Sequence, residues 1–186
     1  MPSFHRNVVV SVLFTFLGGP ALVLVLVPWY ITRLRIPAED APLRIMASAA
    51  MLVLGLVPLF ESIVRFVLKG RGTLVPAVPT EHLVISGLFR FVRNPMYIGV
   101  ITALFGEALL FTSRHMLTYI AIVWLIMHVF VCAYEEPTLA RKYGDEYADF
   151  KQNVPRWIPR LRPWRPAVSS AQSPKPGTFP RPGVSK

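Results

Sequence analysis

The sequence contains a single cysteine, Cys132, among its 186 residues. One thiol excludes an intrachain disulfide and a cysteine-rich zinc site. The four histidines are scattered over different segments, so a metal site is not expected. The chain also has no internal repeat and no recognisable nucleic-acid-binding module, although its net charge is +10. We therefore expect neither a metal ion nor a nucleic acid as a partner.

Charged residues are missing from long stretches of the chain. Val8 to Val27 and Ile45 to Phe60 have none, and Glu107 is the only one within Pro95 to Ser113 and Met116 to Tyr134. About 20 helical residues span the roughly 30 Å of a bilayer's hydrocarbon core. Together with a mean hydropathy of +0.48, these runs predict an all-α integral membrane protein with about four transmembrane helices. The first run is too long for a cleavable signal peptide, whose apolar region is usually about 7–15 residues.

The last two apolar runs are expected to form a helical hairpin, because only Thr112 to His115 separates them. Proline is favoured in the first turn of a helix, so Pro95 indicates where the hairpin begins, and Asn94 is expected to cap it. Pro137 is expected to end the second helix. Apolar residues at helical spacing within Thr138 to Asn153 then predict a cytosolic amphipathic helix.

Three regions follow from these elements. Residues 1–68 are expected to hold two N-terminal transmembrane helices. Residues 69–166 are expected to form the functional core, which opens with a Gly- and Pro-rich loop over Lys69 to Thr80. Residues 167–186 are rich in Ser, Pro and Gly and are expected to be a disordered basic tail.

The basic residues predict the orientation in the membrane. Sixteen of the 20 lysines and arginines fall on the side of the two termini, and four fall on the other side: Arg33, Arg35, Arg44 and Arg114. Because cytoplasmic segments carry the excess of positive charge, both termini are predicted to be cytoplasmic. The same charge attracts anionic lipid headgroups, so the bilayer is the expected partner of the basic surface.

The hairpin would bring two polar motifs to the same cytoplasmic end. Arg93 to Tyr97 opens its first helix, and Glu135 to Pro137 closes its second. An arginine beside a helix N-terminus favours an anionic group. Two carboxylates at a helix C-terminus oppose the helix dipole and call for a cation, which Arg93, Arg141 or a positively charged ligand could supply. A zwitterionic, amino-acid-like ligand would fit between the two motifs.

His128 lies on the same predicted helix face as Cys132 and Glu136, because four residues separate each from the next. Ionisable groups at membrane depth are costly and so indicate function, which makes His128 a candidate base. The alternative is a hydrogen bond from His128 to a neighbouring helix. Cys132 is interpreted as a packing residue. Glu107, near the opposite end of the hairpin, is expected to bond to Thr102, to Thr118 or to another span, and is not assigned to the site.

Several motifs occur in order between Gly70 and Pro159: Gly-Arg-Gly-Thr, Leu-Phe-Arg-Phe-Val-Arg-Asn-Pro-Met-Tyr-Ile-Gly, Tyr-Glu-Glu-Pro-Thr-Leu, Lys-Tyr-Gly-Asp-Glu-Tyr and Val-Pro-Arg-Trp-Ile-Pro. This series resembles the isoprenylcysteine carboxyl methyltransferase and phospholipid methyltransferase superfamily, and especially its small bacterial members. The resemblance implies an enzyme of the bacterial cytoplasmic membrane that uses S-adenosylmethionine. It also implies the site residues: Arg93, Asn94, Pro95, Tyr97, Glu135 and Glu136 for the cofactor, with His128 and Arg156 as catalytic candidates.

The leading hypothesis is therefore methyl transfer to a lipid-like or apolar acceptor that carries a carboxylate, thiol or amine. A carboxylate needs no base, whereas an amine or thiol would, and His128 is the candidate for that role. One alternative is an NADPH-dependent membrane reductase of the sterol-reductase type, which has a similar hairpin. Another is a membrane protein without enzymatic activity. The sequence leaves the acceptor and the oligomeric state open.

Overall fold

The computed structural model describes residues 19–37, 41–70, 83 and 85–165, with the side chains of 66–70 excepted. This part of the chain is helical and contains no strand, as the sequence predicts. Its α-helices are α2 (Gly19–Ala21), α3 (Val27–Thr32), α4 (Pro42–Gly70), α5 (Pro95–Phe111), α6 (Arg114–Phe130) and α7 (Glu136–Asn153). Two π-helical turns, η2 (Leu22–Leu26) and η4 (Val131–Glu135), and one 3-10 turn, η3 (Gly87–Arg90), complete the list.

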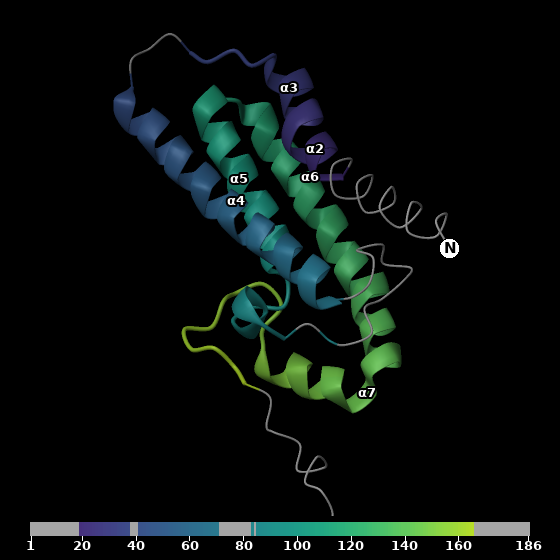
Figure 1. The fold of residues 1–186 in the computed structure, drawn as a ribbon. Coiled ribbons are helices and arrows are strands. Elements are labelled where there is room, and N and C mark those ends of the chain that lie inside the picture. Colours follow the sequence, from purple (N-terminus) through teal and green to yellow (C-terminus); the bar gives the residue numbers. More distant parts are fainter. Residues whose placement is uncertain (1–18, 38–40, 71–82, 84, 166–186) are drawn as a thin grey trace, which may run out of the picture.

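Helix α5 lies between α4 and α6, and the α2–α3 segment packs beside α6 (Figure 1). Close contact between α4 and α5 depends on glycine. A Cβ atom at Gly99 would lie 2.6 Å from the carbonyl oxygen of Gly55 and 3.0 Å from the amide nitrogen of Leu59. Glycine at the facing positions 55 and 99 therefore sets the spacing between α4 and α5. On the other side of the bundle, the hydroxyl of Tyr119 donates to the carbonyl oxygen of Val23 at 2.9 Å.

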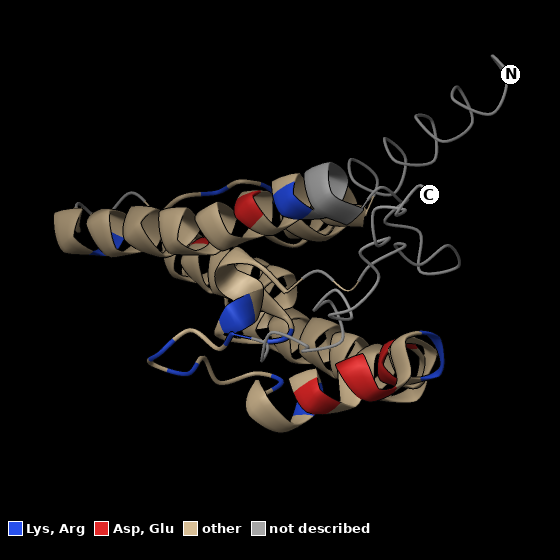
Figure 2. Cartoon of the chain, turned by 60° about the horizontal axis from the view of Figure 1, so that its bottom comes forward, with Lys and Arg blue, Asp and Glu red and all other residues tan. Residues whose placement is uncertain are grey.

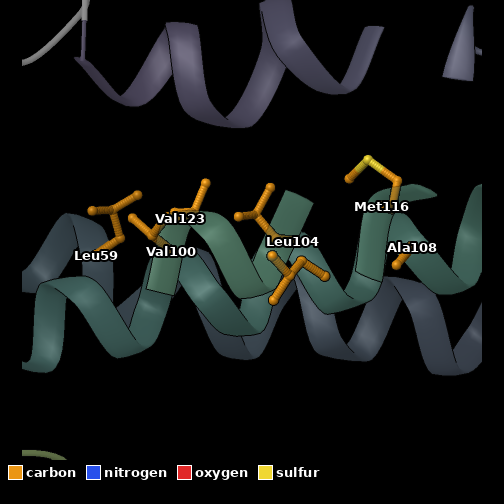
Figure 3. Close-up of a cluster of buried hydrophobic side chains, with 7 residues drawn as sticks. Leu59, Val100, Leu104, Ala108, Met116 and Val123 are labelled. Atoms are coloured by element: carbon orange, nitrogen blue, oxygen red, sulfur yellow. The ribbon is translucent and has the colours of Figure 1, made fainter. Parts of the chain in front are cut away.

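The apolar core runs along the line where these helices meet (Figure 3). It contains buried residues from α4, α5 and α6: Leu59, Val100, Leu104, Ala108, Met116, Ile120 and Val123. Leu104 and Met116 have no exposed surface. Because lipid tails are as apolar as these side chains, it is their close van der Waals packing along this seam that holds α5 and α6 together as a hairpin.

The predicted hairpin is present, with a turn shorter than expected. Helix α5 begins at Pro95 and ends before Thr112, whose left-handed conformation (φ 50°) reverses the chain. Ser113 is extended, and α6 starts at Arg114. Asn94 occupies the N-cap position but makes no capping side-chain hydrogen bond there. Its side-chain amide nitrogen instead donates to the carbonyl oxygen of Arg156 at 3.2 Å, so Asn94 is the N-cap by position, as predicted, but does not cap the helix through its side chain.

The prediction that Pro137 ends the second hairpin helix is also wrong. Helix α6 continues through η4 into α7, where Pro137 occupies the first turn. Proline is common in the first turn of a helix, and α7 follows directly on the π-helical turn η4. The direction changes further on, at Gly144, whose φ of 51° and ψ of −123° are not helical. Consequently Glu135 and Glu136 lie inside a continuous helical rod rather than at a helix C-terminus.

The structure also bears on the predictions for α7, for the loop after α4, for Glu107 and for the C-terminal tail. The apolar face predicted for α7 is confirmed, since Tyr147 and Phe150 are buried with Val154 in a second core cluster. The predicted loop over Lys69 to Thr80 begins later, because α4 extends to Gly70 and residues 71–80 lie outside the described part. Oε2 of Glu107 is buried without a hydrogen-bond partner among the described residues, so the bond expected for this carboxylate is not made by that oxygen. The predicted tail is outside the described residues as well.

Two helical stretches are long and apolar enough to cross a membrane, residues 42–65 and 114–153. The α2–α3 segment and α5 are apolar but shorter. Large apolar side chains cover the outer face of α4, where Val53, Leu54 and Val57 are each 59–65% exposed. Charged residues are concentrated on α7 and the segment after it, while the bundle is almost free of them (Figure 2). This distribution is typical of a protein whose helices face lipid.

Candidate functional site

The C-terminal segment, residues 154–165, folds back along the residues that precede α5. The amide of Arg93 donates to the carbonyl oxygen of Pro155, that of Arg160 to Phe91, and that of Trp164 to Arg90, each at 2.9 Å. These bonds bring the Val-Pro-Arg-Trp-Ile-Pro motif to the same end of the hairpin as the two polar motifs. The site therefore combines three segments that are distant in the sequence.

Glu136 is the centre of an ion-pair cluster. Its Oε1 accepts from Nη1 of Arg93 at 2.9 Å and from Nε of Arg156 at 2.6 Å, and its Oε2 accepts from Nη2 of Arg156 at 2.9 Å. Nζ of Lys151 lies 3.5 Å from Oε2. The side chains of Glu136 and Arg93 are 8% and 9% exposed, whereas Lys151 is 52% exposed. The two arginine pairs therefore hold the segments together, and the lysine adds little.

The cluster changes the acidity of its carboxylate. Burial alone would raise the pKa of Glu136, but the hydrogen bonds from Arg156 and the charges of Arg93, Arg156 and Lys151 hold that pKa below its usual value of 4.5. Glu136 is therefore ionised at neutral pH. Arg93 also donates from Nη1 to the hydroxyl of Tyr147 at 3.4 Å. Its Nε is buried without a hydrogen-bond partner within the described residues.

Glu135 faces a different partner. Its Oε2 accepts from the hydroxyl of Tyr97, in the first turn of α5, at 3.0 Å. Neighbouring residues on a helix point about 100° apart, so two adjacent glutamates reach different groups. The tyrosine ring also meets Trp157 edge-on, with centroids 6.4 Å apart. Tyr97 thus links the acidic motif to an aromatic cluster.

The aromatic cluster surrounds His128. Trp124, one turn earlier on α6, stacks on the imidazole with centroids 5.0 Å apart and planes at 18°. Nε1 of Trp157 donates to Nδ1 of His128 at 3.1 Å. On the other side of the ring, Sγ of Cys132 lies 3.7 Å from Nε2. His128 therefore has contacts on both nitrogens and on one face.

The structure brings the sequence-predicted residues together at one end of the hairpin: Arg93, Asn94, Pro95, Tyr97, His128, Glu135, Glu136 and Arg156. The expected common stripe of His128, Cys132 and Glu136 faces the C-terminal segment. The expected opposition of acidic and basic edges is present as direct ion pairs. The roles assigned to these residues stay predictions.

The sequence analysis missed four contributors: Trp124, Tyr147, Lys151 and Trp157. Two of them carried a usable signal. Trp124 is spaced four residues before His128, which places it on the same helix face. Trp157 directly follows the catalytic candidate Arg156 in the Val-Pro-Arg-Trp-Ile-Pro motif.

Comparison with known proteins identifies the family of this chain. Residues 43–146 match the family described as phospholipid methyltransferase, a range that covers α4 to the first half of α7. Methanethiol S-methyltransferase 1 of Bradyrhizobium diazoefficiens is 40% identical over 81 residues, which are 44% of this chain and 26% of that protein. The chain thus spans about a quarter of the length of that curated relative. No solved structure matches this chain. Since the family match covers more than half of the sequence, the chain belongs to the phospholipid methyltransferase family.

Proposed function

We propose that this protein is an integral-membrane methyltransferase that uses S-adenosylmethionine and methylates an apolar or lipid-like acceptor. The observation that carries the proposal is the polar cluster at one end of the α5–α6 hairpin, in a member of the phospholipid methyltransferase family. There Arg93 and Arg156 bind Glu136, while Glu135 meets Tyr97. Both charge signs are thus present within one or two helical turns of each other.

The cluster has the groups that a zwitterionic cofactor requires. Arg93 has a buried Nε without a partner in the described part of the chain, and a guanidinium offers five N–H donors in all. A ligand carboxylate at this nitrogen would satisfy a donor whose isolation costs roughly 1–3 kcal/mol. Glu136 is already bonded through both oxygens. Glu135 is bonded through Oε2 to Tyr97, so we assign Glu135, rather than Glu136, to the ligand's cationic or hydroxyl groups.

S-adenosylmethionine, when bound, supplies a methyl group on a positively charged sulfur. The protein's part in such a transfer is to align the two reactants and to exclude water. Arg156 and Glu136 contribute by fastening the C-terminal segment over the hairpin end, and Trp157 and Tyr97 add apolar walls. A catalytic role for Arg156 beyond this fastening stays a prediction.

We further propose four membrane spans with the site at the cytoplasmic face. The apolar helices supply the spans, and the first predicted apolar run, residues 8–27, lies partly outside the described residues. The less basic end is marked by Arg44, whose Nη1 donates to Oγ1 of Thr112 at 2.9 Å. Arg35 and Arg114 line one cavity of about 410 Å³ at that same end. The site lies at the opposite, more basic end, and the positive-inside rule assigns that end to the cytoplasm of a bacterial cell.

The acceptor would enter from the lipid, because the outer faces of α4 and α6 are apolar. Carboxylate, thiol and amine acceptors all fit the proposal. The relative named for methanethiol favours a small or apolar thiol among them. The family match favours methyl transfer over the reductase alternative.

Ligand titration tests the proposal. Purified protein in lipid nanodiscs is titrated with S-adenosylhomocysteine and, separately, with NADPH by isothermal calorimetry. Saturable binding of the former alone is expected. Glu135→Gln should weaken that binding about tenfold or more, because a hydrogen bond to a charged group contributes roughly 1.5–3 kcal/mol and 1.4 kcal/mol is tenfold. Tyr97→Phe should weaken it less, since this hydroxyl only orients the carboxylate.

The matched control is Glu146→Gln, the same substitution at an exposed position of α7. It should leave the affinity unchanged. Transfer of label from methyl-labelled S-adenosylmethionine to a cell lipid extract then identifies the acceptor class. Binding of NADPH but not of S-adenosylhomocysteine would refute the proposal, and binding of neither would favour a non-enzymatic protein.

A further inference from the structure

The hydrogen bond between Trp157 and His128 determines where the imidazole carries its proton. An indole N–H can only donate, so the Nδ1 atom that faces it must present a lone pair. A neutral imidazole has one N–H, which must then be on Nε2. The tautomer thus follows from the hydrogen-bond network.

This arrangement conflicts with the role of base that the sequence suggested for His128. The ring can accept a proton only at Nδ1, because Nε2 already has one. A proton on Nδ1 would point at the indole N–H of Trp157, 3.1 Å away, and two donors would face each other. The stacked ring of Trp124 fixes the imidazole plane and opposes its rotation away from this contact.

The Nε2–H donor of His128 points toward a weak hydrogen-bond acceptor. Its Nε2 lies 3.7 Å from Sγ of Cys132, and sulfur is a weak hydrogen-bond acceptor. An anionic oxygen or sulfur from a ligand would be a better acceptor for this N–H. The contact with Cys132 is therefore one that a ligand atom can replace.

We propose that Trp157 is a positioning residue that holds His128 as the Nε2–H tautomer, so that His128 donates a hydrogen bond to an anionic methyl acceptor instead of removing its proton. This inference rests on the proposed methyltransferase function. An anionic acceptor gives a lone pair to the methyl carbon, and the electrons of the broken carbon–sulfur bond stay on the donor's sulfur. The negative and positive charges cancel, and no proton has to leave. A thiolate or carboxylate fits this site, whereas a protonated amine does not.

Nitrogen NMR tests the tautomer directly. The protein is labelled with ¹⁵N-histidine in micelles at neutral pH, and the His128 signals are assigned by their loss in His128→Gln. We expect a protonated Nε2 and an unprotonated Nδ1. In Trp157→Phe, which keeps an aromatic ring but removes the donor, this preference should be lost. A wild-type signal from protonated Nδ1 would overturn the inference.

Activity distinguishes a donor from a base. The glutamine amide of His128→Gln can donate a hydrogen bond but cannot accept a proton at neutral pH. We expect this variant to retain activity within about tenfold of wild type and His128→Leu to lose considerably more. A base contributes typically about 10²–10⁴-fold, so an equally severe loss in both variants would refute the donor role. His115→Gln, at an exposed position at the far end of α6, is the matched control and should have no effect.

Failure of this inference and failure of the proposed function give different results. Wild-type protein that binds S-adenosylhomocysteine and transfers methyl groups, with both His128 variants equally inactive, refutes only the donor role. Wild-type protein that neither binds nor transfers refutes both the function and the donor role, and the NMR result then still decides the tautomer.

Discussion

The ion pairs of Glu136 should hold the C-terminal segment on the hairpin, and Glu136→Gln tests this. Glutamine keeps one oxygen but replaces the other with an amide that faces guanidinium donors. Arg93, only 9% exposed, would lose its counter-charge, and Arg156, 29% exposed, would lose one of two hydrogen bonds. Breaking a buried pair in this way typically costs about 3–5 kcal/mol. Because Arg156 is partly accessible to water, we expect the lower end, about 3 kcal/mol.

Hydrogen exchange measures this cost locally. The amides of Arg160 and Trp164 donate to the residues before α5, so they exchange only when the segment opens. A cost of about 3 kcal/mol raises the open population, and hence the exchange rate, by roughly 100-fold. The assay is exchange followed by mass spectrometry on peptides from residues 154–165, with the protein in nanodiscs.

Lys151→Gln is the control for this experiment. The lysine lies 3.5 Å from Glu136 but is 52% exposed, so its removal should cost less than about 0.5 kcal/mol and change exchange by about twofold at most. Exchange in Glu136→Gln as slow as in wild type would refute the assignment of these pairs as the fastening of the segment. Equal acceleration in both variants would show that proximity to charge, rather than burial, governs the effect.

Two further predictions concern pH and packing. Burial would raise the pKa of Glu136, but the facing guanidinium groups lower it below 4.5 overall. Because the pKa is lower in the folded state than in the unfolded state, the ionised Glu136 stabilises the fold above about pH 4.5. This stabilisation is lost as the pH falls through the folded-state pKa. The ratio of exchange rates between Glu136→Gln and wild type should therefore shrink from pH 6 to pH 3, and a constant ratio would contradict this. Gly99→Ala should lower thermal stability by about 1–3 kcal/mol, because its Cβ would lie 2.6 Å from a carbonyl oxygen of α4. Gly19→Ala, where nothing lies within 4 Å, is its control, and equal effects on the melting temperature would refute the packing argument.

The sequence by itself determined the hairpin and the end at which its polar motifs meet. Two runs of 19 residues, in which Glu107 is the only charge, flank a short turn and leave few alternatives, because a lipid-facing helix disfavours charge and a tight turn forces neighbouring helices to be antiparallel. Arg93 and Glu136 had to share one end for that reason. Pro95 also marked its helix start correctly, since proline fits the first turn.

Proline gave a wrong prediction at Pro137, which was expected to end the second hairpin helix. A proline is compatible both with the end of one helix and with the first turn of the next, and only the π-helical turn η4 decided between them. Local spacing assumes a regular helix and cannot anticipate a shift of this kind.

The pairing of Trp157 with His128 was decided by tertiary structure alone. It depends on the C-terminal segment folding back along residues 90–93 through backbone hydrogen bonds, which any sequence can form and which therefore leave little trace in the sequence. The residue types around the site were readable from the chain. Their partners, and with them the proton on His128, were fixed only when distant segments packed against the end of the hairpin.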